Sequence, residues 1–241
     1  MNIEIRELNE SALFYFEKET LKMKKEIISY AEFTKRTGIK ITQKHTGKMT
    51  GMQSLSTSCL LNKYCQERAK IAGSICSHCY AQRMMSQYGE KFQGCFEKNT
   101  IGLKELIDIN DLPNLNVQYF RFEAFGDLDN ANQLINYFNI CKKNPKTKFA
   151  LWTKNPWIVD EVLKKGESKP KNLNIVLSSL ELNQLTDFSQ YEWADRVFTV
   201  YDKNYIKDHD VEINCGGRSC MSCLKCYRKS NKTFYINEKL K

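Results

Sequence analysis

Apolar positions in the middle of the chain follow two spacings in turn, one typical of buried strands and one typical of helices. Residues 117–122 are β-branched and aromatic, which predicts a strand. After them, apolar side chains recur at the three- and four-residue steps of an amphipathic helix, at Ala131, Leu134, Ile135, Phe138 and Cys141. Pro156 then suits the first turn of a second helix, which we expect to continue to Lys165.

Further strands are predicted before, within and after this region, at residues 52–58, 148–152, 173–180 and 196–201. Strands that alternate with helices indicate βαβ units and a largely parallel sheet. In a chain of 241 residues, such units form either an open doubly wound sheet or a partial (β/α) barrel. Both architectures bind ligands beyond the carboxyl ends of their strands.

The ends of the chain are less regular. Residues 10–35 mix apolar and charged positions at helix-like spacing, and Gly38 is expected to end that region. A second apolar stripe after Ala81 predicts a helix through Met84, Met85, Tyr88, Phe92 and Phe96. We therefore expect three parts: a helical segment at 1–45, an α/β core at 46–210 and a cysteine-rich segment at 211–241.

The composition is ordinary for a soluble globular protein, with 41% hydrophobic and 27% charged residues. No run of about 18 apolar residues is present, so we expect no membrane span. The first residues also lack the pattern of a secretory signal, which predicts a cytoplasmic protein. The 10 cysteines are then reduced, and clustered reduced cysteines are more often metal ligands or catalytic groups than disulfides.

The C-terminal cysteine group consists of Cys215, Cys220, Cys223 and Cys226. Its last three members follow one another at three-residue steps, which wrap a tight loop around one centre as in bacterial ferredoxins. Structural zinc usually takes two Cys-x-x-Cys pairs separated by a longer spacer. The spacing therefore favours a [4Fe–4S] cluster, with zinc as the alternative. The group follows residues 211–214, whose alternating pattern predicts a short strand.

The N-terminal cysteine group consists of Cys59, Cys65, Cys76 and Cys79. The first two reach the second pair only if the intervening loop folds back, which Gly73 would help. Three ligands would leave one iron open for a substrate or cofactor, whereas four would close the site. Cys141 is expected in the core. Cys95 belongs either to the core or to a single larger cluster, as an extra ligand.

Polar residues follow the predicted strands. Glu123 and Asp127 follow residues 117–122 and are candidates for contact with a bound ligand, and Lys154 follows residues 148–152 and could contact an anionic group. Since the first cysteine group follows residues 52–58, we expect both cysteine groups near the same face. The net charge of +9 indicates either a nucleic acid partner or a lysine-rich solvated surface.

These motifs resemble those of the phage-borne "gene product 88" domain proteins, which in turn resemble radical-SAM (S-adenosylmethionine) barrels. The resemblance runs from His45 to Cys226. Its motifs are Thr46-Gly-Lys-Met49, Cys76-Ser-His-Cys79-Tyr80, Arg121-Phe-Glu-Ala-Phe-Gly-Asp127, Trp152-Thr-Lys154 and Cys220-Met-Ser-Cys223-Leu-Lys-Cys226.

The resemblance implies a partial (β/α) barrel with a largely parallel sheet, iron–sulfur ligands at the carboxyl ends of the strands, and a phage or mobile-element origin. S-adenosylmethionine enters as a candidate cofactor through the same resemblance. The chain departs from the radical-SAM Cys-x-x-x-Cys-x-x-Cys pattern at Ala72, where the first cysteine would stand. It also has Phe125-Gly126-Asp127 in place of the Gly-Gly-Glu motif.

Three functions follow as hypotheses. The first is a redox or radical enzyme with one reactive and one auxiliary cluster and a small-molecule ligand. The second is a non-catalytic iron–sulfur protein for electron transfer or sensing, with one or two clusters or one larger cluster, and a redox partner. The third is a zinc-stabilised module that binds nucleic acid.

Overall fold

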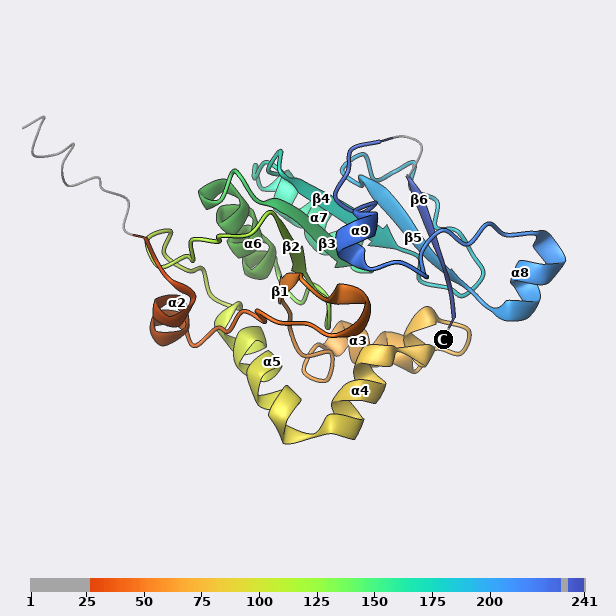
Figure 1. Ribbon diagram of the computed structural model, residues 1–241, viewed down its shortest axis with the longest axis horizontal. Helices are drawn as coiled ribbons and strands as arrows, with labels where there is room; N and C mark the ends of the chain where they lie inside the picture. Colours follow the sequence, from red (N-terminus) through yellow and green to blue (C-terminus); the bar gives the residue numbers. More distant parts are fainter. Residues whose placement is uncertain (1–26, 231–233, 241) are drawn as a thin grey trace, which may run out of the picture.

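The computed structural model describes residues 27–230 and 234–240. Its centre is a six-stranded sheet in which every neighbouring pair of strands is parallel (Figure 1). The strands are β1 (Gln53–Leu55), β2 (Tyr119–Phe122), β3 (Lys148–Thr153), β4 (Leu173–Ser178), β5 (Arg196–Tyr201) and β6 (Tyr235–Lys239). The predicted α/β class and parallel sheet are confirmed.

The strands lie in the sheet in the same order as in the chain, from β1 to β6. A doubly wound sheet reverses its strand order at a switch point, whereas a (β/α) barrel keeps the order of the chain. Among the named strands of the described residues, β1 pairs only with β2 and β6 only with β5, so the sheet is open; isolated bridges link Thr42 to β1 and Cys215 to β6. The architecture is an open sheet wound in one direction.

One face of the sheet is covered by α6 (Ala131–Lys143) and α7 (Pro156–Lys164), and the main core lies between them and the strands. Alternate strand residues such as Phe122 and Phe149 point to this side, and Tyr137 of α6 stacks on Phe122 at 4.2 Å between ring centroids. Cys141 is fully buried in this core, as predicted. Both helices lie where the sequence predicted them, because each buries an apolar stripe whose spacing is visible in the sequence.

The other face carries residues 215–227 with the short helix α9 (Cys220–Cys223), which lies across the sheet on the side away from α6 (Figure 1). Residues 211–214, predicted as a strand, are not one. Instead Asn214 and Cys215 both donate backbone hydrogen bonds to the Asn237 carbonyl of β6. Helix α8 (Lys203–His209) follows β5.

The remaining elements precede β1 or connect it to β2. They are α2 (Tyr30–Thr37), η1 (Gly47–Met49), α3 (Lys63–Ala69), η2 (Ile75–His78), α4 (Tyr80–Tyr88) and α5 (Glu90–Gly102), the first two of which precede β1. Gly38 ends α2 in a left-handed conformation, as predicted. Most of the predicted helix at 10–35, and most of the segment 1–45, lies outside the described residues. The predicted strand at 52–58 is limited to β1.

Candidate metal centres

The four cysteines of the C-terminal group line one pocket on the open face of the sheet. Cys215 is held at β6 by its backbone bond to Asn237, at 2.9 Å. Cys220 and Cys223 lie at the two ends of α9, whose N-cap Ser219 accepts a hydrogen bond from the Ser222 amide. The fold therefore brings these four predicted ligands to one place.

A left-handed turn brings the last of these ligands into the pocket. Leu224 adopts φ 53°, which ends α9 and turns the chain back toward the sheet. The Cys226 carbonyl then accepts a hydrogen bond from Asn174 Nδ2 of β4 at 3.1 Å. Tyr227 is buried against Met52 and Tyr119, and its ring lies 5.3 Å from that of Tyr119.

Two cations line the same pocket. Lys48 Nζ lies 3.1 Å from Cys215 Sγ and 2.8 Å from Glu238 Oε1. Burial acts to lower the pKa of Lys48, but the charges of Glu238 and Cys215 overcome it, so this pKa is raised. Lys48 therefore stays protonated beside the thiol.

The second cation, Arg121, projects from β2, with its guanidinium 3.8 Å from the centroid of the Trp152 ring. Its Nε atom is buried without a hydrogen-bond partner in the described structure. Burial raises the pKa of Cys226 to about 12, while the charge of Arg121 acts in the opposite direction. A negatively charged group in the pocket would meet this cation.

The N-terminal cysteine group lies at the carboxyl ends of β1 to β4. Cys59 follows β1, Cys65 lies in α3, Cys76 lies in η2, and Cys79 precedes α4. In the loop between them, Gly73 adopts φ 81° and the Ile75 amide bonds to the Leu180 carbonyl at 2.9 Å, beyond β4.

The thiols of this group influence one another. Burial raises the pKa of Cys59 to about 12, and the charges of Cys79, Glu123 and Cys76 act in the same direction. Burial likewise raises the pKa of Cys65, with contributions from Asp127 and the other three cysteines. Cys59 Sγ also lies 3.4 Å from Met85 Sδ. Four thiols in a largely apolar setting suit a soft metal ligand set.

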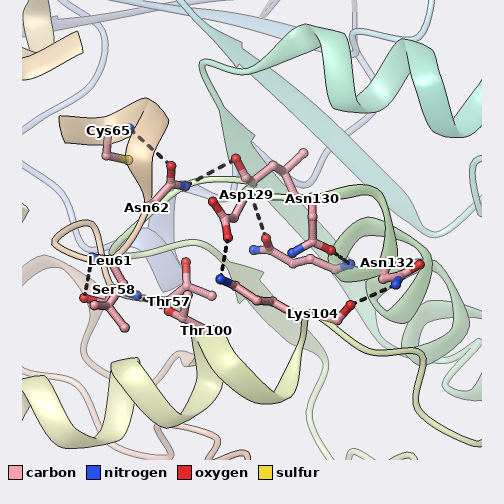
Figure 2. Close-up of polar contacts among 12 residues, drawn as sticks. Thr57, Ser58, Leu61, Asn62, Cys65, Thr100, Lys104, Asp129, Asn130 and Asn132 are labelled. Carbon is pink, nitrogen blue, oxygen red and sulfur yellow. Dashed lines mark hydrogen bonds and ion pairs between the residues drawn. The ribbon is translucent and has the colours of Figure 1, made fainter. Parts of the chain in front are cut away.

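Asn62, which sequence analysis missed, fixes the helix that carries Cys65 (Figure 2). Its Oδ1 accepts a hydrogen bond from the Cys65 amide at 3.2 Å, as the N-cap of α3. Its Nδ2 donates to the carbonyls of Asp127 and Leu128, at 3.1 and 3.3 Å. The signal in the sequence was an Asn three residues before Cys65, a common N-cap spacing.

Glu123 points into the protein from the end of β2. It adopts φ 53°, uncommon for a side chain of its size, and is 3% exposed. Its carboxyl accepts hydrogen bonds from Thr57 Oγ1 at 2.8 Å, from Gln133 Nε2 at 2.7 Å and from the Tyr137 hydroxyl. Burial raises its pKa to about 8, although the hydrogen bonds from Tyr137 and Thr57 oppose the shift. Glu123 therefore anchors the loop that follows β2.

Asp127 joins this loop to the end of β3. Its carboxylate accepts hydrogen bonds from Thr153 Oγ1 at 2.6 Å and from the Lys154 amide at 2.9 Å. Burial raises its pKa, with Lys154 and these bonds acting against the shift. Both oxygen atoms are thus occupied within the chain. Like Glu123, Asp127 positions the backbone around the N-terminal cysteine group.

Lys154 extends into the N-terminal cysteine group. Its carbonyl accepts a hydrogen bond from the Tyr64 hydroxyl, so its backbone is held on both sides. Burial acts to lower the pKa of Lys154, but the charges of Cys76, Asp127, Cys79 and Cys65 overcome it and raise this pKa. Its ammonium group therefore supplies positive charge for these thiols.

Residues 21–236 match a family model described as Gene product 88. The chain belongs to the Gene product 88 family. The match covers most of the chain and includes both cysteine groups. No curated protein and no solved structure matches the chain. This match confirms the resemblance of the sequence to the phage-borne family. It does not bear on the resemblance to radical-SAM barrels.

The two cysteine groups of this Gene product 88 protein occupy different parts of the sheet. The N-terminal group lies at the carboxyl ends of the strands, as predicted. The prediction was wrong for the C-terminal group, which lies against the broad face, because Tyr227 packs on the side chains of that face. Tyr80, which follows Cys79, donates a hydrogen bond to the Ala124 carbonyl at 2.5 Å.

Charged residues near both cysteine groups influence the pKa of Tyr80. Burial raises its pKa, and this shift is opposed by Arg121, which faces the C-terminal group, and by Lys154 of the N-terminal group. Cys95 lies apart from both groups, half-buried on α5, and its charged neighbours are Lys40 and Lys98. This arrangement gives no support to Cys95 as an extra ligand.

Within residues 27–230 and 234–240, no three His, Cys, Asp or Glu side chains are close enough together to hold a single metal ion. None of the ten cysteines is in a disulfide bond. In the same described part of the Gene product 88 chain, no helix combines the length and apolar character needed to cross a membrane.

Proposed function

We propose that this protein binds iron–sulfur clusters, with one cluster at each cysteine group. The observation that carries the proposal is the C-terminal pocket, which four cysteines line together with Lys48 and Arg121. Thiolates are the usual ligands of iron–sulfur clusters, and a [4Fe–4S]²⁺ core with four of them has a charge of roughly −2. Two cations and an apolar floor suit such a group.

The N-terminal group likewise combines four cysteines with a lysine, at a different location in the fold. Cys76, Cys79 and one or both of Cys59 and Cys65 would hold the second cluster, and Lys154 would offset its charge. With three of these ligands, one iron would stay open for a small molecule. Ligands of parallel α/β sheets bind at the carboxyl ends of the strands, which is where this group lies. We infer that this is the reactive centre and the place where a small molecule, such as S-adenosylmethionine, would bind.

An iron–sulfur cluster supplies one-electron transfer when it is bound. The chain's own residues would then do three things. Lys48, Arg121 and Lys154 would hold positive charge beside the thiolates. Met52, Trp152 and Tyr227 would keep water from the C-terminal site. Asn62 and Asp127 would fix the backbone of the N-terminal site.

A non-catalytic iron–sulfur protein is the second candidate, and the presence of four thiols in each group favours it, because four ligands close a cubane cluster. It would act in electron transfer or sensing with a redox partner. A single larger cluster is a variant of this candidate. We infer that the protein acts in the host cytoplasm, where the ten unpaired cysteines would stay reduced.

Spectroscopy of protein purified without oxygen tests the proposal. Mössbauer spectra of ⁵⁷Fe-enriched protein should show the signature of [4Fe–4S]²⁺ clusters, and reduction should produce an EPR signal. Mononuclear zinc, with DNA or RNA binding that weakens steeply as salt is raised, would instead favour a nucleic-acid-binding module. Binding of S-adenosylmethionine to the loaded protein would separate the reactive from the non-catalytic form.

A further inference from the structure

The open edges of the sheet are joined through the residues around the C-terminal cysteine group. Lys48, which precedes β1, forms an ion pair with Glu238 of β6, at 2.8 Å and with partly buried side chains. Lys48 lies in η1, shortly before the edge strand β1, and Glu238 lies in β6, the edge strand at the other side of the sheet. Unpaired strand edges expose backbone donors and acceptors, so a protein gains from covering or joining them.

Contacts between α9 and the segment that leads into β1 form a second part of this connection. Helix α9 packs on η1, and a side chain added at Gly51, whose φ is +84°, would come within 3.2 Å of Met221 Cγ. The Tyr227 hydroxyl also lies 3.6 Å from Met52 Sδ. The backbone of the C-terminal group therefore lies directly against the segment that leads into β1.

The four thiols are distributed over this connection. Cys215 pairs with the β6 edge, Cys220 and Cys223 bracket α9 on the η1 side, and Cys226 lies over β4. We propose that a cluster bound by these four cysteines cross-links the two open edges of the sheet, and that Lys48 is the positioning residue that connects the cluster to both edges. The inference rests on the proposed iron–sulfur function.

Lys48 suits this role because it contacts groups from both sides. Its Nζ atom bonds Cys215 Sγ and Glu238 Oε1, and without it the carboxylate would face a thiolate of the same charge. A cation at this position removes that repulsion and fixes the η1 segment to β6. A Lys48→Arg variant keeps the cation and should keep the connection.

Hydrogen exchange of the full chain, prepared without oxygen with and without cluster, tests the inference. We expect loading to slow amide exchange by roughly tenfold or more in residues 47–55 and 235–239 together. At equal iron content, Lys48→Met should exchange about fivefold faster than wild type in residues 47–55, as expected for loss of a partly buried ion pair. Lys44→Met, an exposed position on the same segment, should not.

The outcomes separate the two proposals. Loading that protects residues 215–227 alone, or equal exchange in Lys48→Met and Lys44→Met, would overturn the cross-link and leave cluster binding intact. Protein that takes up neither iron nor sulfide would overturn both. Restored protection in Lys48→Arg would show that the cation, and not the shape of the side chain, carries the effect.

Discussion

Arg121 and Trp152 form a stacked pair on neighbouring strands, with the guanidinium 3.8 Å from the centroid of the indole ring. The pair places a cation on the open face of the sheet, above which the C-terminal cysteines lie. Stacking holds Arg121 in place, and within residues 27–230 and 234–240 it forms no ion pair with a carboxylate, which leaves its charge available to the thiols.

Replacement of Arg121 should therefore change the reduction potential of the C-terminal cluster. A nearby positive charge stabilises the reduced, more negative form, so Arg121→Met should lower the potential by on the order of 50 mV. Arg121→Lys should change it less. The measurement is an EPR-monitored redox titration of loaded protein, and an unchanged potential in Arg121→Met would contradict the assignment.

Gly126 should tolerate no side chain. A Cβ there would lie 2.3 Å from Thr57 Oγ1 and 2.8 Å from Glu123 Oε2, and φ is +85°. We expect Gly126→Ala to lower stability by about 3 kcal/mol or more, through strain and displacement of the loop after β2. Gly166→Ala is the matched control.

Gly166 has a similar φ of +93° but open space around its Cβ position. Its substitution should therefore cost only the backbone strain, about 1 kcal/mol. Thermal unfolding of both variants measures the difference. Equal losses of stability would mean that the contact with Thr57 and Glu123 does not matter.

Glu123 should make stability depend on pH. Its pKa is raised to about 8 in the folded protein, against an ordinary value near 4.5. The folded state then binds more protons than the unfolded state between these values, so its stabilising effect is full below pH 4.5 and is lost as the pH rises toward 8. Between pH 5 and pH 8, we expect Tm to fall by roughly 5–10 °C.

A neutral side chain at this position removes the titration. Glu123→Gln should flatten the pH dependence relative to wild type, whereas Glu192→Gln, at an exposed position, should leave it unchanged. Scanning calorimetry at several pH values checks this. A Glu123→Gln curve parallel to that of wild type would show that another group is responsible.

Asn62 should be needed for the N-terminal metal centre. Asn62→Ala removes the N-cap of α3 and two further hydrogen bonds, which should cost about 2 kcal/mol and loosen the helix that carries Cys65. We expect the iron content to fall toward half. Asn130→Ala removes the N-cap of α6, a helix that carries none of the eight candidate ligands, and should leave the iron content unchanged.

Sequence periodicity was sufficient for the elements whose apolar faces pack on the main core. The strand at 117–122 and the helix at 131–141 were predicted because burial of one face fixes their spacing. The strand at 52–58 is shorter, because the backbone and side chains of Ser56 and Thr57 bond to the loop after β2. Such pairing depends on residues about 70 positions away.

Spacing was also sufficient to propose the two cysteine groups as candidate ligand sets, but their locations in the fold could be predicted only in part. Local spacing cannot indicate that Tyr227 packs on Met52, the contact that brings the C-terminal group onto the face of the sheet. Glu123 and Asp127 were placed correctly at a strand end. Their inward direction depends on the positive φ of Glu123, which its sequence neighbours do not signal.

The central claim is that both cysteine groups hold iron–sulfur clusters. The most direct measurement is iron, acid-labile sulfide and zinc per chain in protein purified without oxygen, in wild type and in a variant with Cys220 and Cys223 changed to Ser. The account predicts roughly eight iron and eight sulfide in wild type and about half of each in the variant. Zinc without sulfide would contradict it.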